Sequence, residues 1–105
     1  MGTWLVQSIT GNGQTKNLDS CSRQNYYVFT DKTFKAVDYD TEQNGACVEE
    51  IKKGSYTISG NQLIMTSEME KEIKVFTIER EILTLTETYK ENDNTIIEVT
   101  VYKRK

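Results

Sequence analysis

The chain has 105 residues, a formal net charge of −3, and neither histidine nor proline. This length suits one small domain spanning residues 1–105, and 28% charged with 36% hydrophobic residues is typical of a folded globular chain. The absence of histidine excludes histidine-based catalysis and imidazole metal sites, and the acidic balance argues against nucleic acid as a partner.

Alternation of apolar and polar residues predicts β-strands rather than helices along this chain. In chain order, the expected strands are Thr3–Thr10, Asn25–Asp31, Thr33–Asp40, Gly54–Ser59, Gln62–Ser67, Glu72–Ile78, Glu81–Tyr89 and Thr95–Lys103. Threonine, valine, isoleucine and tyrosine, which favour strands, are common in them. Two longer stretches, Gly11–Gln24 and Thr41–Lys53, are expected to be loops.

Short turn sequences separate most of these strands. Gly11-Asn12-Gly13 follows the first strand, Gly60-Asn61 is a two-residue hairpin signal, and Asn92-Asp93-Asn94 precedes the last strand. Eight strands connected in this way form either a closed up-and-down barrel or a two-sheet sandwich. We favour the all-β fold of an eight-stranded antiparallel up-and-down barrel, because the last three strands each have one apolar face and closure removes exposed edges.

Several short motifs follow one another in a recognisable order. A Gly2-Thr3-Trp4 start is followed by Cys21 before a Tyr/Phe-rich strand, then by Cys47 and the alternating segment Gly54-x-Tyr56-x-Ile58-x-Gly60-Asn61-x-Leu63. The final strand closes on Val101-Tyr102-Lys103. In this order and spacing, the chain resembles the short lipocalin-like domains of bacterial secreted proteins and surface lipoproteins, over essentially its whole length. The resemblance implies an eight-stranded barrel.

The resemblance also implies a role for the first-strand tryptophan. In this family it packs near the closed end of the barrel, often under a basic side chain from the final strand. Here the tryptophan is Trp4, and either Lys103 or Arg104 supplies the basic side chain. The chain is shorter than full-length lipocalins and lacks their C-terminal helix pattern, which argues against a large ligand calyx.

Two cysteines, Cys21 and Cys47, flank the second and third expected strands. Since these strands pair as a hairpin, their outer ends meet at one rim, and we expect a disulfide closing a loop of roughly 27 residues. A disulfide favours an oxidising, extracytoplasmic location. The alternative is two separate cysteines that pack as small hydrophobic residues. A catalytic thiol is not expected, because no histidine is present to activate it.

Apolar and aromatic side chains on one face of the expected strands are predicted to point into the barrel. They are Phe29, Phe34, Tyr56, Ile58, Leu63, Met65, Val75, Leu83, Leu85, Val99 and Val101. An eight-stranded barrel is near the size at which such side chains either fill the interior or leave room for one small ligand. For the second case, the predicted ligand-binding residues are Tyr27, Phe29, Phe34, Tyr56, Met65, Leu83, Leu85 and Val99.

Acidic residues are frequent between strands, but we predict neither a metal site nor a cofactor. Asp38, Asp40 and Glu42 would share one face of an extended chain, and oxygen ligands on one face suit Ca²⁺. The glycine that an EF-hand loop needs is missing after them, so solvated loop charge is the favoured interpretation. The glutamates of residues 68–72 are interpreted as a charged connection rather than a catalytic carboxylate pair.

The favoured hypothesis is a non-enzymatic, extracytoplasmic lipocalin-like domain (secreted, periplasmic or a cell-surface lipoprotein) that binds a small apolar ligand in the barrel mouth. The alternative is a protein-binding barrel with a filled core, such as a protease inhibitor or an envelope or adhesion module, that uses its rim loops and the tyrosines Tyr26, Tyr27 and Tyr39. A membrane is expected as a partner only through a lipid anchor outside this chain. The start of the chain has neither the basic nor the apolar region of a signal peptide, which leaves a cytosolic protein or a mature region with an added initiator Met.

Overall fold

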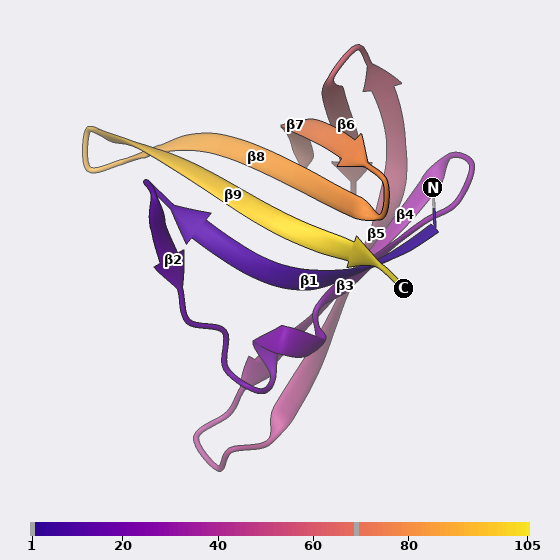
Figure 1. Cartoon of the computed structure of the whole chain (residues 1–105). Coiled ribbons are helices and arrows are strands. Elements are labelled where there is room, and N and C mark those ends of the chain that lie inside the picture. The colour runs from indigo at the N-terminus through magenta and orange to yellow at the C-terminus, as the bar shows by residue number, and fades with distance from the viewer. Residues whose placement is uncertain (1, 69) are drawn as a thin grey trace.

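A computed structural model describes residues 2–68 and 70–105, in which nine strands form one antiparallel sheet that closes on itself (Figure 1). Met1 and Met69 lie outside the described residues. The elements are β1 (Gly2–Gly11), β2 (Gln14–Lys16), the 3-10 helix η1 (Ser22–Gln24), β3 (Tyr26–Phe29), β4 (Thr33–Thr41), β5 (Cys47–Ser59), β6 (Gln62–Ser67), β7 (Lys71–Glu79), β8 (Ile82–Glu91) and β9 (Asn94–Arg104). In this part of the chain no helix has the length and apolarity needed to cross a membrane.

The first strand closes the barrel. β1 pairs with β3 from Gly2 to Leu5, and with β9 from the Trp4–Arg104 pair to the Gly11–Glu98 pair. The short β2 pairs only with the far end of β1, so the other eight strands make up the barrel wall. The prediction of an eight-stranded antiparallel up-and-down barrel is therefore confirmed, and the two-sheet sandwich is wrong.

The expected strands are confirmed with small shifts at their ends, except at β5. This strand begins at Cys47 instead of Gly54, because residues 47–53 continue the ladder with β4 as far as the Thr41–Cys47 pair. Every residue from 47 to 53 is exposed, so the apolar alternation that marks a half-buried strand is missing there. β2 and η1 likewise lie within residues 11–24, which were expected to be a loop.

Two-residue turns hold the hairpins in register. Gly60 and Asn61 connect Ser59 to Gln62 as the sequence predicts, and Gly60 has a φ of 61°. At the β8–β9 turn, Asn92 and Asp93 have φ values of 51° and 65°. Tight hairpin turns of this kind require the left-handed region, which glycine, asparagine and aspartate tolerate best.

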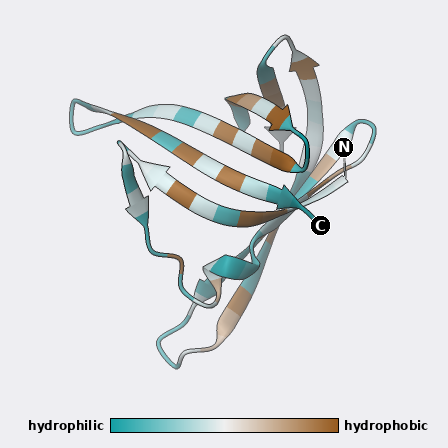
Figure 2. Cartoon of the chain, viewed as in Figure 1, coloured by the Kyte–Doolittle hydropathy of each residue, from teal (hydrophilic) through white to brown (hydrophobic). Residues whose placement is uncertain are grey.

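One end of the barrel is a solid hydrophobic core. Trp4, Leu63 and Leu83 are fully buried there. Hydrophobic and hydrophilic residues alternate along several strands (Figure 2), so every second side chain of such a strand faces the interior. The buried cluster comprises Trp4, Val6, Phe29, Phe34, Ala36, Leu63, Met65, Leu83, Leu85 and Tyr102. Close packing of large side chains at this end stabilises the fold by removing apolar area from water.

Arg104 is the basic residue that covers Trp4. Its guanidinium carbon lies 4.7 Å from the centroid of the indole ring, and the two residues are directly opposite each other in the β1–β9 ladder. A cation over the face of a tryptophan is attracted by the ring quadrupole. Of the two candidates, Lys103 and Arg104, the structure thus selects Arg104.

A second, smaller buried region lies outside the barrel wall. Val37 is fully buried although its neighbours on β4, Phe34 and Ala36, belong to the interior cluster. The segment before β3 packs here, because the Asn25 side chain accepts a 2.7 Å hydrogen bond from the Tyr39 amide. The predicted Cys21–Cys47 disulfide is confirmed and ties this segment to the start of β5.

The predicted inward face is wrong at three positions. A fourth residue, Ile58, pairs with buried Leu63 on the inner face but is 50% exposed. Val75, between the inward-facing Lys74 and Phe76, is 40% exposed on the outer face. On β9, Tyr102 belongs to the interior cluster, so alternation places Val101 and Val99 on the outer face. Both faces of β7 and β9 carry β-branched residues, and hydrophobicity alone therefore did not determine which face points inward.

Candidate functional site

The other half of the barrel contains a partly enclosed cavity of about 200 Å³. Residues from β1, β3, β4, β7 and β9 form its wall, together with Asn25 immediately before β3. The lining residues are Val6, Ile9, Asn25, Tyr26, Tyr27, Asp38, Lys74, Glu98, Thr100 and Tyr102. The barrel is thus filled at one end and open at the other.

A bulge in β1 determines which of its side chains reach the cavity. Val6 pairs with Tyr102 and Ser8 with the preceding residue, Val101, so Gln7 is an extra residue in the ladder. An extra residue shifts the alternation by one position. As a result both Val6 and Ile9 line the cavity, although they are three residues apart.

Two tyrosines form the boundary between the cavity and the core. The rings of Tyr27 and Tyr102 meet edge to face with their centroids 5.4 Å apart, and Tyr27 also stacks on Phe29 at 5.3 Å. Tyr102 is only 8% exposed, yet its hydroxyl makes no hydrogen bond to another described residue. Burial raises the pKa of both phenols, so each is a neutral donor and acceptor at neutral pH.

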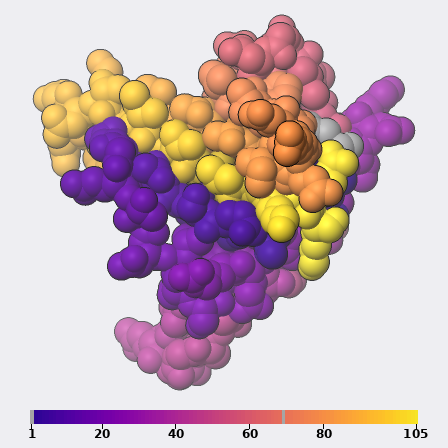
Figure 3. All heavy atoms as spheres, in the orientation of Figure 1, coloured from indigo at the N-terminus to yellow at the C-terminus, as the bar shows by residue number. Residues whose placement is uncertain are grey.

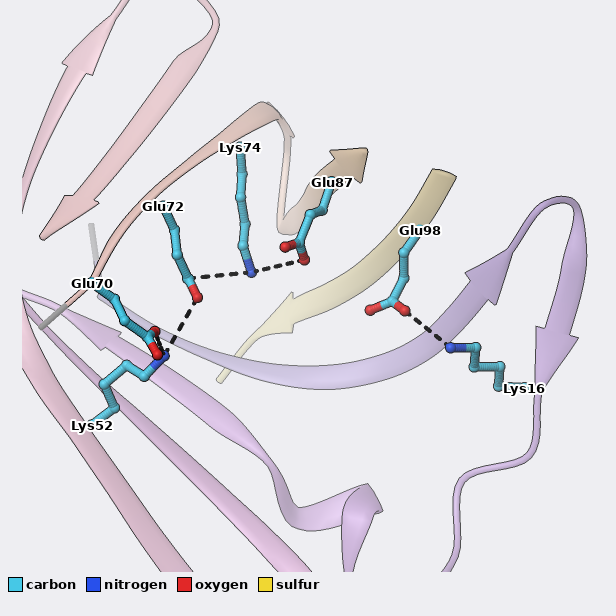
Figure 4. A network of polar contacts seen from close by, with 7 residues as sticks. All are labelled: Lys16, Lys52, Glu70, Glu72, Lys74, Glu87 and Glu98. Atoms are coloured by element: carbon cyan, nitrogen blue, oxygen red, sulfur yellow. Dashed lines mark hydrogen bonds and ion pairs between the residues drawn. The ribbon is translucent and has the colours of Figure 1, made fainter. Parts of the chain in front are cut away.

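A lysine lies inside the barrel and is held by carboxylates on both sides (Figure 4). The Lys74 ammonium is 3.9 Å from a Glu72 carboxylate oxygen and 3.8 Å from one of Glu87, and its side chain is 14% exposed. Burial lowers the pKa of Lys74, but Tyr27, Glu87 and Glu72 together outweigh burial, and the pKa is raised. Lys74 is therefore charged at neutral pH.

Two further lysines face carboxylates around the opening of the barrel. Lys52 on β5 lies 3.0 Å from Glu70 and 3.4 Å from Glu72, and Lys16 on β2 lies 3.0 Å from Glu98 (Figure 4). In both cases a hydrogen bond to the first carboxylate contributes most to a raised pKa of the lysine. Exposed pairs of this kind contribute little to stability. They fix the positions of the charges around the cavity.

Asp38 is the cavity residue whose charge is least compensated. It makes no ion pair with another described residue. Desolvation raises the pKa of the Asp38 carboxyl, and the nearby carboxylates Asp40 and Glu50 raise it further, against the opposing effects of Lys52 and Lys74. Asp38 is an exposed residue at the edge of the cavity, so the surroundings that disfavour its charge remain accessible to water.

This arrangement provides hydrogen bonds, aromatic faces and charge to a bound molecule. Within residues 2–68 and 70–105, no group of three or more His, Cys, Asp or Glu side chains is placed to hold a metal ion. The geometry is that of a binding site with fixed polar groups around a small space.

The structure gives the eight predicted ligand-binding residues four different placements. Phe29, Phe34, Met65, Leu83 and Leu85 are buried and pack against one another in the closed half. Tyr27 lines the cavity, whereas Val99 lies on the strand face opposite to its neighbours Glu98 and Thr100, which do line it. Tyr56 packs edge to face on Phe29 and donates its hydroxyl to the Thr30 carbonyl oxygen.

Of the three tyrosines expected at one rim, two come together at the cavity. Tyr26 and Tyr27 line it, whereas Tyr39 donates a 2.8 Å hydrogen bond to Glu49 on the neighbouring strand. A cross-strand partner on an exposed face explains the position of Tyr39 without a ligand.

Sequence reasoning missed most of the cavity lining. Asp38 was interpreted as solvated loop charge, and Lys74, Glu98, Thr100 and Tyr102 alternate with the valines Val75, Val99 and Val101, which were expected to point inward. One signal was available: Tyr102 and Phe76 lie on the same faces as these polar residues. A large aromatic side chain among polar neighbours on one face indicates that the face is enclosed at one end.

Among the comparisons with known proteins, one family profile identifies the family, and solved structures support the fold. The profile of a family described as "Lipocalin-like domain" matches residues 1–103. No functionally curated protein shows significant sequence similarity to the chain.

Three similar solved structures are an uncharacterized protein from Bacteroides eggerthii, the possum milk whey lipocalin trichosurin, and aphrodisin, a sex pheromone from female hamster. Their TM-scores are 0.65, 0.61 and 0.54, at sequence identities of 12%, 9% and 12%. The alignments cover 100%, 97% and 99% of this chain and 98%, 73% and 74% of the respective neighbours. Trichosurin was crystallised with bound 4-ethylphenol.

Proposed function

The chain belongs to the lipocalin-like domain family, and we propose that it acts as a single non-enzymatic domain that binds one small molecule in the open half of its barrel. The observation that carries this proposal is the cavity of about 200 Å³ above the filled core, with two largely buried tyrosines at its base. The packed core supports the bottom of the cavity rigidly, and the partly open end of the barrel allows a ligand to enter.

The ligand we propose is small and amphipathic rather than purely apolar. The apolar side chains that were expected to surround an apolar ligand are already packed against one another in the closed half. The cavity lining instead combines Tyr27, Tyr102 and Val6 with charged and hydroxyl groups. A phenol such as 4-ethylphenol, which trichosurin binds, has this combination of an aromatic body and a polar group.

The extracytoplasmic location remains part of the proposal. The Cys21–Cys47 disulfide supports it, because structural disulfides form and persist in oxidising compartments. Extraction from cells under thiol-trapping conditions, followed by mass spectrometry, will measure the oxidation state. Recovery of Cys21 and Cys47 as free thiols would contradict this location.

Binding is tested by titrating the isotope-labelled protein with three phenols that differ in charge: 4-ethylphenol, tyramine and 3-(4-hydroxyphenyl)propionate. We expect saturable shifts of the backbone amide resonances of Val6, Tyr27 and Tyr102 with at least one of them, and little change at Val75 on the outer face. If none of the three probes produces a saturable change at the cavity residues, the proposed function is wrong.

A matched pair of variants on β9 locates the site. Thr100→Phe adds a ring at a cavity position, and Val99→Phe adds the same ring to the outer face of the adjacent residue. We expect the first variant to abolish binding and the second to retain it, with both folded by circular dichroism. Equal binding by the two variants would place the ligand outside the cavity.

The second candidate is protein binding through the end of the β4–β5 hairpin, which projects from the barrel (Figures 1 and 3). Val48 and Ile51, on opposite faces of β5, are 41% and 46% exposed. The disulfide at Cys47 lies beside the turn, where Cys47 pairs with Thr41. The test compares the binding of peptides, copied from exposed loops of candidate partner proteins, to the native protein and to a Val48→Ser/Ile51→Ser variant. Equal binding to both would exclude this surface.

A further inference from the structure

The positive charges around the cavity are already neutralised by the protein itself. Lys74 lies between Glu72 and Glu87, at 3.9 and 3.8 Å, and Lys16 is bonded to Glu98 at 3.0 Å. Lys52, at the opening, contacts two carboxylates as well (Figure 4). None of these ammonium groups is therefore available as the main counter-ion of an anionic ligand.

Unpaired negative charge remains on β4 and β5, on the strand face that also carries Lys52. Asp38 and Glu50 are directly opposite each other in the β4–β5 ladder, and Asp40 follows Asp38 on the same face. None of the three makes an ion pair with another described residue. Like charges on neighbouring positions destabilise a sheet unless a cation compensates them. Of these carboxylates, Asp38 is the one that lines the cavity.

Aromatic and hydroxyl groups line the cavity together with Asp38. The Tyr102 side chain is more than nine-tenths buried, lines the cavity and has no hydrogen-bond partner for its hydroxyl among the described residues. Burial raises the pKa of Tyr102 most, and Tyr27 together with the carboxylates Asp38, Glu98 and Glu72 raises it further. The Tyr27 ring meets Tyr102 edge to face at the same place.

We propose that the cavity binds a small aromatic amine in its ammonium form, with Asp38 as the counter-ion and Tyr27 and Tyr102 around the ring. This inference rests on the proposed function and specifies its ligand class. The ammonium group would compensate Asp38, and the tyrosine faces would add a cation–π attraction. The free Tyr102 hydroxyl would hydrogen-bond a polar group of the ligand.

The size of the cavity fits a ligand of this class. A buried cavity of about 150 Å³ accepts benzene, and drug-sized molecules occupy pockets of about 300 Å³ or more. At about 200 Å³, this cavity accommodates one aromatic ring with a short side chain. A long acyl chain or a fused-ring ligand exceeds that volume.

Three phenols with the same ring test the charge preference by isothermal titration calorimetry. Tyramine is 4-ethylphenol with an ammonium group on the ethyl chain, and 3-(4-hydroxyphenyl)propionate carries a carboxylate at the corresponding position. We expect tyramine to bind at least about tenfold more tightly than 4-ethylphenol, because a hydrogen bond to a charged partner is stronger than a neutral one, and the anion to bind most weakly.

A variant of the counter-ion and a control of equal net charge complete the test. Asp38→Asn keeps the shape of the side chain, and we expect it to reduce the preference for tyramine over 4-ethylphenol to about unity. Glu79→Gln removes one negative charge from an exposed position near the closed end of β7 and should leave the preference unchanged.

The outcomes separate this inference from the proposed function. If 4-ethylphenol or the anion binds at least as tightly as tyramine, the domain is a small-molecule binder and the amine proposal is wrong. If Asp38→Asn and Glu79→Gln alter the tyramine preference equally, Asp38 is not the counter-ion. If none of the three phenols binds to the native protein, the proposed function itself fails.

Discussion

The closed and open halves of the barrel are built from the same strands, but different kinds of side chain point inward. On β8, Leu83 and Leu85 in the core are followed by Glu87 toward the open end, and on β7, Phe76 is preceded by Lys74 and Glu72. On β7 and β8, strand alternation continues without a break through both halves. Alternation thus selects which residues point inward, while their chemistry decides whether the interior is solid or hollow.

The two halves also differ in what they contribute to stability. Packing in the closed half buries apolar area and stabilises the fold. In the open half, desolvation and neighbouring carboxylates raise the pKa of Asp38, which means that its negative charge is unfavourable in the folded protein. Local features that work against stability are expected at functional sites.

The largest effect is expected from truncating the centre of the closed half. Trp4→Ala removes the largest fully buried side chain and should reduce the free energy of unfolding by about 3–5 kcal/mol. The matched change in the open half, Thr100→Ala, should reduce it by less than about 1 kcal/mol, because no packed core surrounds that side chain. Urea unfolding followed by circular dichroism measures both. Similar losses would show that the halves do not differ.

Reduction of the disulfide should have the next largest effect. Cys21 and Cys47 are 26 residues apart, and in the chain-entropy model closing such a loop stabilises the fold by about 3.5 kcal/mol. Urea unfolding with and without a reductant measures this contribution. The control is the double variant Cys21→Ser/Cys47→Ser, whose stability should not respond to the reductant. Equal stability of the oxidised and reduced native protein would contradict the prediction.

A smaller loss of stability is expected when the cation over the Trp4 ring is removed. Arg104→Gln loses the cation–π contact with Trp4 and should destabilise the protein by about 0.5–1 kcal/mol. Lys103→Gln removes the same charge from the adjacent residue and should have a smaller effect. If Lys103→Gln lowered the melting temperature more than Arg104→Gln, the contact of Arg104 with Trp4 would not be the one that stabilises the protein.

The smallest expected effect is a gain in stability, and it comes from removing the charge of Asp38 in the open half. Because the folded-state pKa of Asp38 lies above its ordinary value of 3.8, the folded protein binds this proton more tightly than the unfolded chain does, and stability decreases as pH rises through that range. Asp40 and Glu50 strengthen this effect, and Lys52 and Lys74 oppose it.

We therefore expect Asp38→Asn to melt slightly above the native protein at about pH 7 and to lose this advantage at about pH 3, where the native carboxyl is protonated in both states. Differential scanning calorimetry at the two pH values measures the difference. A lower melting temperature of the variant at neutral pH would show that the Asp38 charge stabilises the fold.

The fold was predictable because its signals are local. The Gly60-Asn61 turn and the alternation around Leu83 and Leu85 depend on a few neighbouring residues, and the structure contains both as expected. The pairing of β4 with residues 47–53 was not predictable in the same way. These residues are all exposed, and long-range hydrogen bonds to β4 rather than apolar burial hold them in a strand.

The candidate site was only partly predictable, for a physical reason. Tyr27 was identified, but Lys74 and Asp38 carry charges that ordinarily indicate the outer face of a strand. Inside the barrel, Lys74 is compensated by carboxylates from its own strand and from β8, and that pairing depends on the register of β7 against β8. The Gln7 bulge, which brings Ile9 into the cavity, depends likewise on the partner strand β9.

The most direct measurement is a crystal structure of the native protein grown with tyramine. We predict the phenol ring in the open half beside Tyr27 and Tyr102, with the ammonium nitrogen at about 2.7–3.0 Å from an Asp38 carboxylate oxygen, and the closed half unchanged. Tyramine bound only on the outer wall, with the cavity left empty at a saturating concentration, would contradict the division of this barrel into a solid half and a binding half.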